Sequence, residues 1–297
     1  MKSTMFLQNV TVIDHAWVDD KGEINGNSYN LCVEITGEID EQEQVVIDFS
    51  GCKKAIKHLV DDSEFAIDHR LVVVNGLSDA IVVTEAGKMH VDTPVFSAES
   101  TVSDWVQVIK PYQLFEKNLL IPVDTKYMNY VTEYLEQMLQ EQLVKLGYPV
   151  TLVTVELSEK FDLPSWSESH VEFNYAHGLR SSTSYGCQNI AHGHRSYIAV
   201  DVKTGPTGRK ELKRIAEEMS GYLAHADNIA GDRSVEYVSG RGYFRMQHEN
   251  TIWLPNETTV ENLTEFIARK YKDEFEAMGA SRLWVSEGLS KGAVVSL

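Results

Sequence analysis

The sequence predicts an α+β protein made of two similar halves, each an antiparallel sheet with a pair of helices on one face. Three observations support this prediction. Both halves begin with two alternating, strand-like runs that are joined through a small polar triplet centred on glycine. In both halves an amphipathic helix follows these strands. In both, a second helix leads into a strand that carries a glutamate, and such internal repetition is a guide to architecture.

The paired strands come first in each half. The first half reads VTVIDHAWVDDKGEINGNSYNLCVEITGE, and the second reads VEFNYAHGLRSSTSYGCQNIAHGHRSYIAVDVKTG. In this alignment His15 corresponds to His177. The triplet Asn25-Gly26-Asn27 corresponds to His192-Gly193-His194.

The first helix of each half is predicted from apolar residues at 3.6-residue spacing. These residues are Cys52, Ala55, Ile56, Leu59 and Val60 in the first half, and Leu212, Ile215, Ala216, Met219 and Leu223 in the second. Each helix is expected to end in a turn that bears a histidine. That histidine is His69, after Asp68, in the first half, and His225 in the second.

A second helix and a closing strand complete each half. The apolar stripes are Tyr127, Tyr130, Val131, Tyr134, Leu135 and Met138 in one helix, and Leu263, Phe266, Ile267, Ala268 and Tyr271 in the other. Thr258 as N-cap and Glu261 at the third helical position form a capping box before the later helix. The strands that follow carry Glu156 and Glu287 at the same relative place.

Two domains are expected, 1–165 and 166–297. The boundary is predicted in KFDLPSWSESH, where Pro164 and a serine-rich run interrupt the pattern. The first domain also carries an insertion at about 75–120, which shows no regular pattern.

Composition narrows the class of protein. A net charge of −17 argues against nonspecific binding to nucleic acid or acidic membranes. There are three cysteines, Cys32, Cys52 and Cys187, and no CxxC pair. So few cysteines are typical of a protein in a reducing compartment rather than of a disulfide scaffold. We therefore expect a cytoplasmic protein with no nucleic-acid or membrane partner.

The histidine-rich segment is the strongest candidate for chemistry. His192 and His194 alternate around Gly193, so their side chains leave a strand on one face. With His177 they would supply three imidazoles, the number that a catalytic zinc takes while keeping one position open. Imidazole also suits iron and nickel. The alternative interpretation, which holds for most isolated His-x-His pairs, is surface histidines without a metal.

Several of these segments together resemble the 6-pyruvoyl-tetrahydropterin synthase and 6-carboxytetrahydropterin synthase family, whose members have the tunnelling fold (T-fold). In the second half the resemblance rests on NYAHGL, the cysteine before HGH, TTVENLTEFI and VSEGLSK. In the first half it rests on VVIDFSGCKKAI, IDHR and VTVELSEK. The resemblance implies two tandem T-fold domains, whose sheets assemble into a barrel in a homo-oligomer.

The resemblance also implies a Zn²⁺-dependent lyase that acts on the small-molecule substrate 7,8-dihydroneopterin triphosphate. By this resemblance, the metal bound by His177, His192 and His194 would be zinc. Cys187 would be a catalytic base, and Asp68 with His69 a second acid–base pair. Substrate binding would involve Glu287 as the pterin anchor, with Thr259 and Glu261 close to the pterin. Lys53, Lys54, Arg70 and Lys291 are candidates for the triphosphate, and none of them is favoured.

Each half departs from the family pattern in a different way. The first has Asn25 and Asn27 where zinc histidines are expected, and the second has Ala224 in place of the aspartate of the Asp-His motif. We therefore predict one composite site per chain, with metal ligands from the second half and Asp68 and His69 from the first. His225 is the alternative relay.

The expected product is 6-carboxytetrahydropterin, a queuosine precursor. Two alternatives are 6-pyruvoyl-tetrahydropterin and, in a different class, a noncatalytic protein that only binds pterin.

Overall fold

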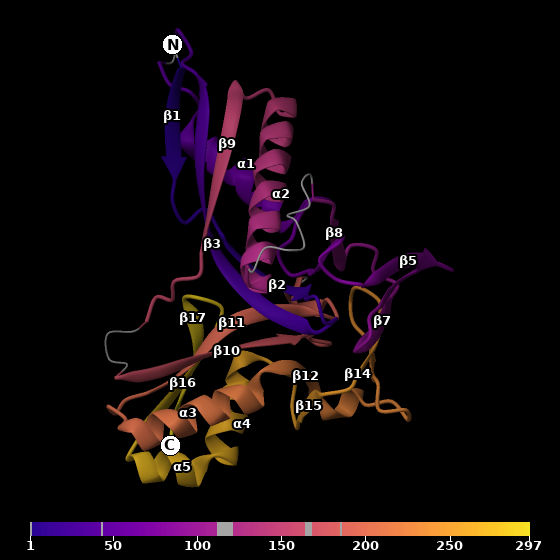
Figure 1. Ribbon diagram of the computed structural model, residues 1–297, viewed down its shortest axis with the longest axis vertical. Helices are drawn as coiled ribbons and strands as arrows, with labels where there is room; N and C mark the ends of the chain where they lie inside the picture. The colour runs from indigo at the N-terminus through magenta and orange to yellow at the C-terminus, as the bar shows by residue number, and fades with distance from the viewer. Residues whose placement is uncertain (1, 43, 112–120, 164–167, 185) are drawn as a thin grey trace.

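The molecule has a layered architecture. The computed structural model describes residues 2–42, 44–111, 121–163, 168–184 and 186–297. Figure 1 shows two sheets that meet near the middle of the molecule, with helices on the outer side of each. Three apolar clusters follow these layers. One lies between the first sheet and its helices, one between the second sheet and its helices, and one between the two sheets. Both faces are therefore covered by apolar side chains where the two sheets meet, whereas Phe6 and Leu152 of the first sheet are exposed.

The first sheet is organised around one long strand. Its strands are β1 (Lys2–Leu7), β2 (Val12–Val18), β3 (Ile24–Glu38), β4 (Leu71–Val74), β8 (Val106–Ile109) and β9 (Val150–Ser158). The early part of β3 pairs with β2, and its later part pairs with β1 on one side and β9 on the other. Beyond β2, the strands β4 and β8 add in parallel.

The second sheet repeats this order. Its strands are β10 (Ser169–His177), β11 (His192–Val200), β12 (Gly221–His225), β15 (Thr251–Leu254), β16 (Arg282–Glu287) and β17 (Lys291–Ser296). The order β15-β12-β10-β11-β16 matches β8-β4-β2-β3-β9 in the first sheet, with parallel pairs at the same places. The predicted repeat is present, but the sheets are mixed rather than antiparallel. The reason is that β4 and β12 each follow a helix, which returns the chain in its original direction.

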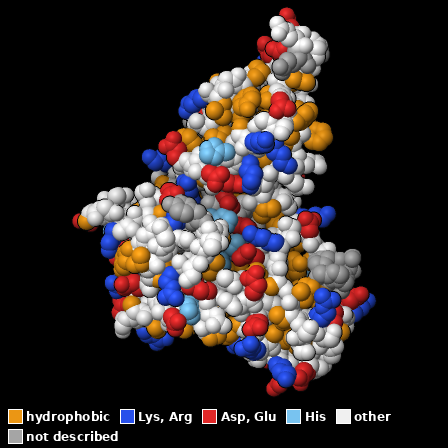
Figure 2. Space-filling view, turned by 180° about the vertical axis from the view of Figure 1, so that it is seen from behind, with side chains coloured by type: hydrophobic (Ala, Val, Ile, Leu, Met, Phe, Trp, Pro, Cys, Tyr) orange, Lys and Arg blue, Asp and Glu red, His pale blue; other side chains and the backbone are white. Residues whose placement is uncertain are grey.

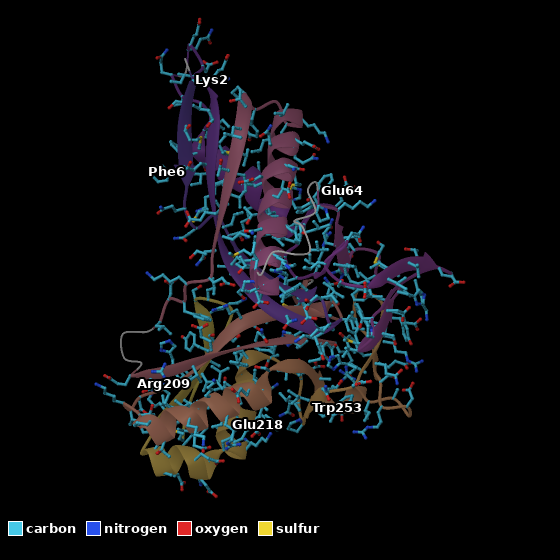
Figure 3. All side chains as sticks on the ribbon, in the orientation of Figure 1. Lys2, Phe6, Glu64, Arg209, Glu218 and Trp253 are labelled. Carbon is cyan, nitrogen blue, oxygen red and sulfur yellow. The ribbon has the colours of Figure 1, made fainter. Side chains whose placement is uncertain are left out.

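Five α-helices occur in the described part of the chain. They are α1 (Phe49–Asp61), α2 (Val123–Lys145), α3 (Pro206–Met219), α4 (Val260–Lys270) and α5 (Lys272–Met278). α1 starts at Asp48, whose carboxylate accepts from the backbone N–H of Gly51. α3 lies in the outer layer, where Figure 3 labels Arg209 and Glu218 on it. Leu223, predicted as helical, lies in β12, because the chain leaves the helix after Met219. Of these helices, none has the length and apolar character that crossing a membrane requires.

The insertion in the first half is regular, contrary to the prediction. It forms β5 (Ile81–Glu85), β6 (Lys88–Asp92) and β7 (Phe96–Ser100), and β7 pairs with β14 (Tyr243–His248) of the second half. With β13 (Val235–Val238) these strands make a third sheet, which Figure 1 shows to one side of the main layers. This sheet links the two halves by backbone hydrogen bonds. Residues 112–120 of the insertion, and the predicted boundary at 165/166, lie outside the described residues.

Candidate metal centre and acid–base site

Three histidines of the second sheet meet at the ends of two neighbouring strands. β10 ends at His177 and β11 begins at His192, and these residues face each other across the ladder. His194 lies two residues along β11, so its side chain leaves the same face as His192. All three are buried, and their candidate ligand atoms lie within 4.8 Å of one another. Nε2 of His177 is 3.2 Å from Nε2 of His194. The three predicted ligands therefore converge.

The state of these imidazoles fits a metal ion. Burial, reinforced by the neighbouring histidines, lowers the pKa of His177 and His192 well below the ordinary value. A neutral imidazole keeps one nitrogen lone pair free for a metal. Nδ1 of His177 lies 2.9 Å from both the backbone oxygen and the hydroxyl of Thr258, which leaves its Nε2 for an ion. Nε2 of His192 is buried and has no hydrogen-bond partner in the described chain. This donor set suits zinc with one open position.

A second group of possible ligands adjoins the three histidines. It consists of His69, Cys187 and His192, whose ligand atoms also lie within 4.8 Å of one another. The rings of His69 and His192 are 5.1 Å apart between centroids. Because the two groups share His192, they form one continuous centre. The first half of the chain supplies His69, and the second half supplies Cys187 and the other three histidines.

The loop that carries Asp68 and His69 is tied to β2. Nδ1 of His69 is 2.6 Å from the Asp68 carboxylate. The His69 backbone N–H donates to the oxygen of Asp14, and the Asp14 N–H donates to the Asp68 carboxylate. His69 has a φ of 53°, which is uncommon for a residue other than glycine and costs some strain. These contacts hold the pair in place, and they leave Nε2 of His69 directed to other partners.

Cys187 approaches His69 through a short 3₁₀ helix, Gly186–Gln188. A Cβ added to Gly186 would lie 2.8 Å from the Cβ of His69, so a glycine is needed for this approach. Burial alone would raise the pKa of the Cys187 thiol, but the hydrogen bond and charge of His69 lower it below the ordinary value. Burial would lower the pKa of His69, yet Asp68 and Cys187 raise it well above the ordinary value. The pair therefore favours a thiolate beside an imidazolium, the reactive form of a cysteine.

The third sheet supports this loop, which gives the insertion a structural role. Arg241, in the turn between β13 and β14, donates to the side-chain oxygen of Asn189 at 2.6 Å. It also forms an ion pair with Asp104, between β7 and β8. Asn189 in turn donates to the backbone oxygen of His69. Side chains from both halves thus fix the segment after Cys187.

Glu287 lies at the edge of the histidine cluster. Its carboxylate is 3.8 Å from Nε2 of His194 and 3.5 Å from Nζ of Lys291, and its side chain is 20% exposed. Among the four triphosphate candidates, Lys291 is the one at this centre. Arg70 instead is buried, and its guanidinium donates to the backbone oxygens of Ser63 and Glu64.

The start of α4 differs from the predicted capping box. The N-cap is Thr259, which accepts from the N–H of Asn262, so Glu261 falls one position earlier in the helix than predicted. Glu261 is exposed. Thr258, predicted as the cap, is buried against His177 instead. The sequence did not reveal this role, because either residue of a threonine pair before a helix can serve as its N-cap.

The glycines of the two triplets fix the correspondence between the halves. Gly26 and Gly193 meet where the sheets touch, since a Cβ on Gly193 would lie 2.5 Å from the Cα of Gly26. Gly26 pairs with Ala16, and Gly193 pairs with Ala176. Asn25 and Asn27 then match His192 and His194, as the sequence alignment predicted.

The predicted match of His15 with His177 is wrong. In the strand register, Trp17 occupies the place of His177, and it stacks on Tyr127 with 4.1 Å between ring centroids. His15 lies two residues earlier, in the apolar core, where burial lowers its pKa to about 4. An indole and two amides therefore stand where the second half has three imidazoles.

Two other correspondences also fail. His69 precedes β4, whereas His225 ends β12, so His225 and Ala224 are not the counterparts of His69 and Asp68. Nε2 of His225 lies 3.1 Å from the backbone oxygen of Pro255 and 3.6 Å from Asp227. Glu156 pairs with Cys32 and is exposed, whereas Glu287 is 20% exposed and lies 3.8 Å from Nε2 of His194.

The site lies where the two halves meet. On the face seen in Figure 2, histidine and acidic side chains gather at the level between the upper and lower parts of the molecule. The side chain of His69 is 19% exposed, whereas that of His194 is 1% exposed. Asp68 and His69 therefore lie closer to solvent than the buried histidines of the second half.

Comparison with known protein families gives a match in the second half of the chain. A family model described as 6-pyruvoyl tetrahydropterin synthase matches residues 168–296. A solved structure of Plasmodium vivax 6-pyruvoyltetrahydropterin synthase is similar at 16% identity, covering 55% of this chain and 94% of that chain, with a TM-score of 0.35. The Plasmodium falciparum 6-pyruvoyl tetrahydropterin synthase is similar at 16% identity, covering 43% of this chain and 97% of that chain, with a TM-score of 0.31. No curated protein sequence matches the chain.

Proposed function

We propose that the chain belongs to the 6-pyruvoyl tetrahydropterin synthase family, whose model matches residues 168–296, and that it is a zinc-dependent lyase of a pterin triphosphate. One observation carries the proposal. His69 of the first half lies with Cys187 and His192 of the second, so that a proton-handling pair adjoins a possible metal site. A protein that only binds pterin would not need this juxtaposition.

The proposed substrate is 7,8-dihydroneopterin triphosphate, the substrate that the family resemblance implies. The reaction removes triphosphate. The side chain is then either cleaved with water, which leaves a carboxyl group and releases a two-carbon aldehyde, or rearranged to a pyruvoyl group. In both cases the dihydropterin ring takes up the hydrogens that the side chain loses and becomes a tetrahydropterin. We propose 6-carboxytetrahydropterin, a queuosine precursor, as the product, with 6-pyruvoyl-tetrahydropterin as the alternative. Both reactions begin with the same proton transfers.

We propose that residues 1–165 and 166–297 are tandem T-fold domains with complementary losses. The repeated strand order supports the tandem arrangement. Trp17, Asn25 and Asn27 would leave the first domain without a zinc site, while its Asp68 and His69 serve the site of the second. Each chain would then contain one complete site. Association of such sheets into a barrel would make the protein a homo-oligomer.

His177, His192 and His194 would hold the zinc ion, which when bound polarises the hydroxyl groups of the substrate side chain. Asp68 holds Nδ1 of His69 at 2.6 Å and so fixes the tautomer that presents Nε2 to Cys187. The Cys187 thiolate accepts a proton from the substrate side chain. His69, as imidazolium, donates a proton to a departing or developing oxygen. Burial of the histidines restricts water at the reacting atoms.

Glu287 would anchor the pterin. A pterin presents an exocyclic amino group and a ring N–H side by side, and one carboxylate accepts both hydrogen bonds. Nζ of Lys291 lies 3.5 Å from this carboxylate and forms an ion pair with it. Thr259 and Glu261 are proposed to lie close to the pterin, with Thr259 acting through its position at the start of α4.

Glu287→Gln is expected to weaken substrate binding. The amide can accept only one of the two hydrogen bonds and has no charge, so we expect kcat/KM to fall about 10- to 100-fold, since a hydrogen bond to a charged group contributes about 1.5–3 kcal/mol. Steady-state kinetics measure this effect. Glu156→Gln is the matched control, because Glu156 is an exposed glutamate on β9. Equal losses in both variants, or no loss in either, would contradict the anchor role.

The proposed function is tested by product identification. Purified, zinc-loaded protein is incubated with 7,8-dihydroneopterin triphosphate, and the products are identified by mass. A 6-carboxy product supports the first proposal, and a 6-pyruvoyl product supports the alternative. Unreacted substrate that co-elutes with the protein would replace the enzyme proposal with pterin binding.

A further inference from the structure

Asp14 is a buried carboxylate of the first half that touches the metal centre of the second. Its side chain is 4% exposed, and Oδ1 lies 3.3 Å from Nδ1 of His194. Oδ1 also accepts a hydrogen bond of 2.5 Å from the hydroxyl of Ser28. Oδ2 lies 3.3 Å from Nζ of Lys291. A carboxylate this deeply buried is rare unless charged partners compensate it.

The alternation of β2 explains how Asp14 reaches the second half. Ile13 and Trp17 pack in the cluster beneath the helices of the first half. Asp14 and Ala16 therefore point to the opposite face, toward the second sheet. Ser28 directly faces Asp14 across the β2–β3 ladder. Its hydroxyl also accepts from the backbone N–H of Arg195, next to His194, and so bridges the two sheets.

The backbone of the same residue holds the acid–base loop. The Asp14 N–H donates to the carboxylate of Asp68 at 2.8 Å, and the Asp14 oxygen accepts from the N–H of His69 at 2.6 Å. One residue of β2 thus contacts a metal-ligand candidate through its side chain and the proton-handling pair through its main chain.

We propose that Asp14 is a positioning residue that orients His194 for the metal ion and sets its distance from Asp68 and His69. A histidine that binds metal through Nε2 commonly directs its Nδ1–H to a carboxylate, which fixes the ring and strengthens the ligand. Here the carboxylate is that of Asp14, from the other half of the chain, which lies 3.3 Å from Nδ1 of His194 as an ion-pair contact rather than a hydrogen bond. The first half therefore contributes to the metal centre itself as well as to proton transfer. This inference rests on the proposed zinc site.

The test is zinc affinity in the full-length protein, measured by competition with a chromophoric chelator. Asp14→Asn keeps the size of the side chain and both main-chain contacts but removes the charge. We expect the dissociation constant for Zn²⁺ to rise about 10- to 100-fold, the usual cost of losing such a partner. The visible spectrum of the Co²⁺-substituted variant should also differ from that of the parent, because one ligand is less well oriented.

Asp61→Asn is the matched control. Asp61 is also a shielded aspartate, with a 12% exposed side chain, but it lies on α1 and its carboxylate pairs with Lys57 and Thr11 rather than with a histidine. We expect its zinc affinity to equal that of the parent. Equal affinities in Asp14→Asn and the parent, or equal weakening in both variants, would overturn the inference.

If Asp14→Asn does not fold, a second variant can still test the inference. Ser28→Ala removes the 2.5 Å hydrogen bond to Asp14 and is expected to weaken zinc binding several-fold. Unchanged affinity in this variant would also overturn the inference. Zinc binding by the parent protein shows whether the proposed metal centre fails or only the proposed role of Asp14. If the parent binds no zinc, the proposed metal centre fails, whereas zinc binding that is insensitive to both substitutions refutes the role of Asp14 alone.

Discussion

Alanine in place of His177, His192 or His194 is expected to remove zinc from the protein and to abolish most of its activity. The parent should bind about one zinc ion per chain, and each variant much less, because two imidazoles without the third hold the ion poorly. Polarisation of the substrate by a metal is worth several kcal/mol. Since about 1.4 kcal/mol is tenfold in rate, we expect turnover to fall at least about 100-fold. Elemental analysis and kinetics measure the two effects.

Removal of the metal with a chelator tests the role of zinc without a substitution. The parent should lose activity when a chelator removes the metal and regain it when Zn²⁺ is added. His170→Ala is the matched control, because His170 lies on β10 like His177 but at the opposite end of the strand. It should keep both zinc and activity. Full activity in a zinc-free His177→Ala variant, verified as folded by circular dichroism, would exclude a catalytic metal at this site.

The faces of the strands could be predicted from the sequence, whereas the register between the halves could not. His15 and Trp17 are two residues apart, so both point to the same face of β2. The alternating pattern therefore assigned His15 to the correct face but not to the position that corresponds to His177. That position became visible from the contact between Gly26 and Gly193, which depends on how the two sheets pack.

The sequence also did not predict where the helices end and the next strands begin. α1 is followed by a turn that bears Asp68 and His69 before β4 begins, whereas β12 begins two residues after α3. The amphipathic pattern marks the helices well but does not fix where the next strand starts, since boundaries depend on local capping and tertiary contacts. His225 was therefore aligned with His69 although the two lie at opposite ends of corresponding strands.

Contacts between distant segments account for what the sequence could not supply. β7 and β14 are separated in the sequence by α2, α3 and several strands, and no local pattern predicts their pairing. In the sequence, Asp14 is likewise only one polar residue in an alternating strand, with no sign of its contact in the second half. Its approach to His194 depends on the face-to-face packing of the sheets. The grouping of His177, His192 and His194 could be predicted because these residues lie on one short segment and its partner strand.

Cys187→Ala and His69→Gln are each expected to lower kcat about 10²- to 10⁴-fold while leaving zinc bound, because each removes a group that transfers a proton. The double variant should be little worse than either single variant, since residues that act as a unit are not additive. His58→Gln is the matched control. His58 also faces an aspartate, at 3.7 Å from Asp62, but this pair is exposed on α1 and should not affect kcat.

The pH dependence of thiol alkylation tests the interaction of Cys187 with His69 directly. In the parent His69 lowers the pKa of Cys187, so the thiolate is present below the ordinary range and iodoacetamide should react at neutral pH. In His69→Gln that contribution is lost and burial raises the pKa, so the alkylation profile should shift to higher pH. The modified residue is identified by peptide mass. If the parent and His69→Gln share one profile, the imidazole does not activate the thiol. Cys187 would then have to act in proton transfer without the first half of the chain.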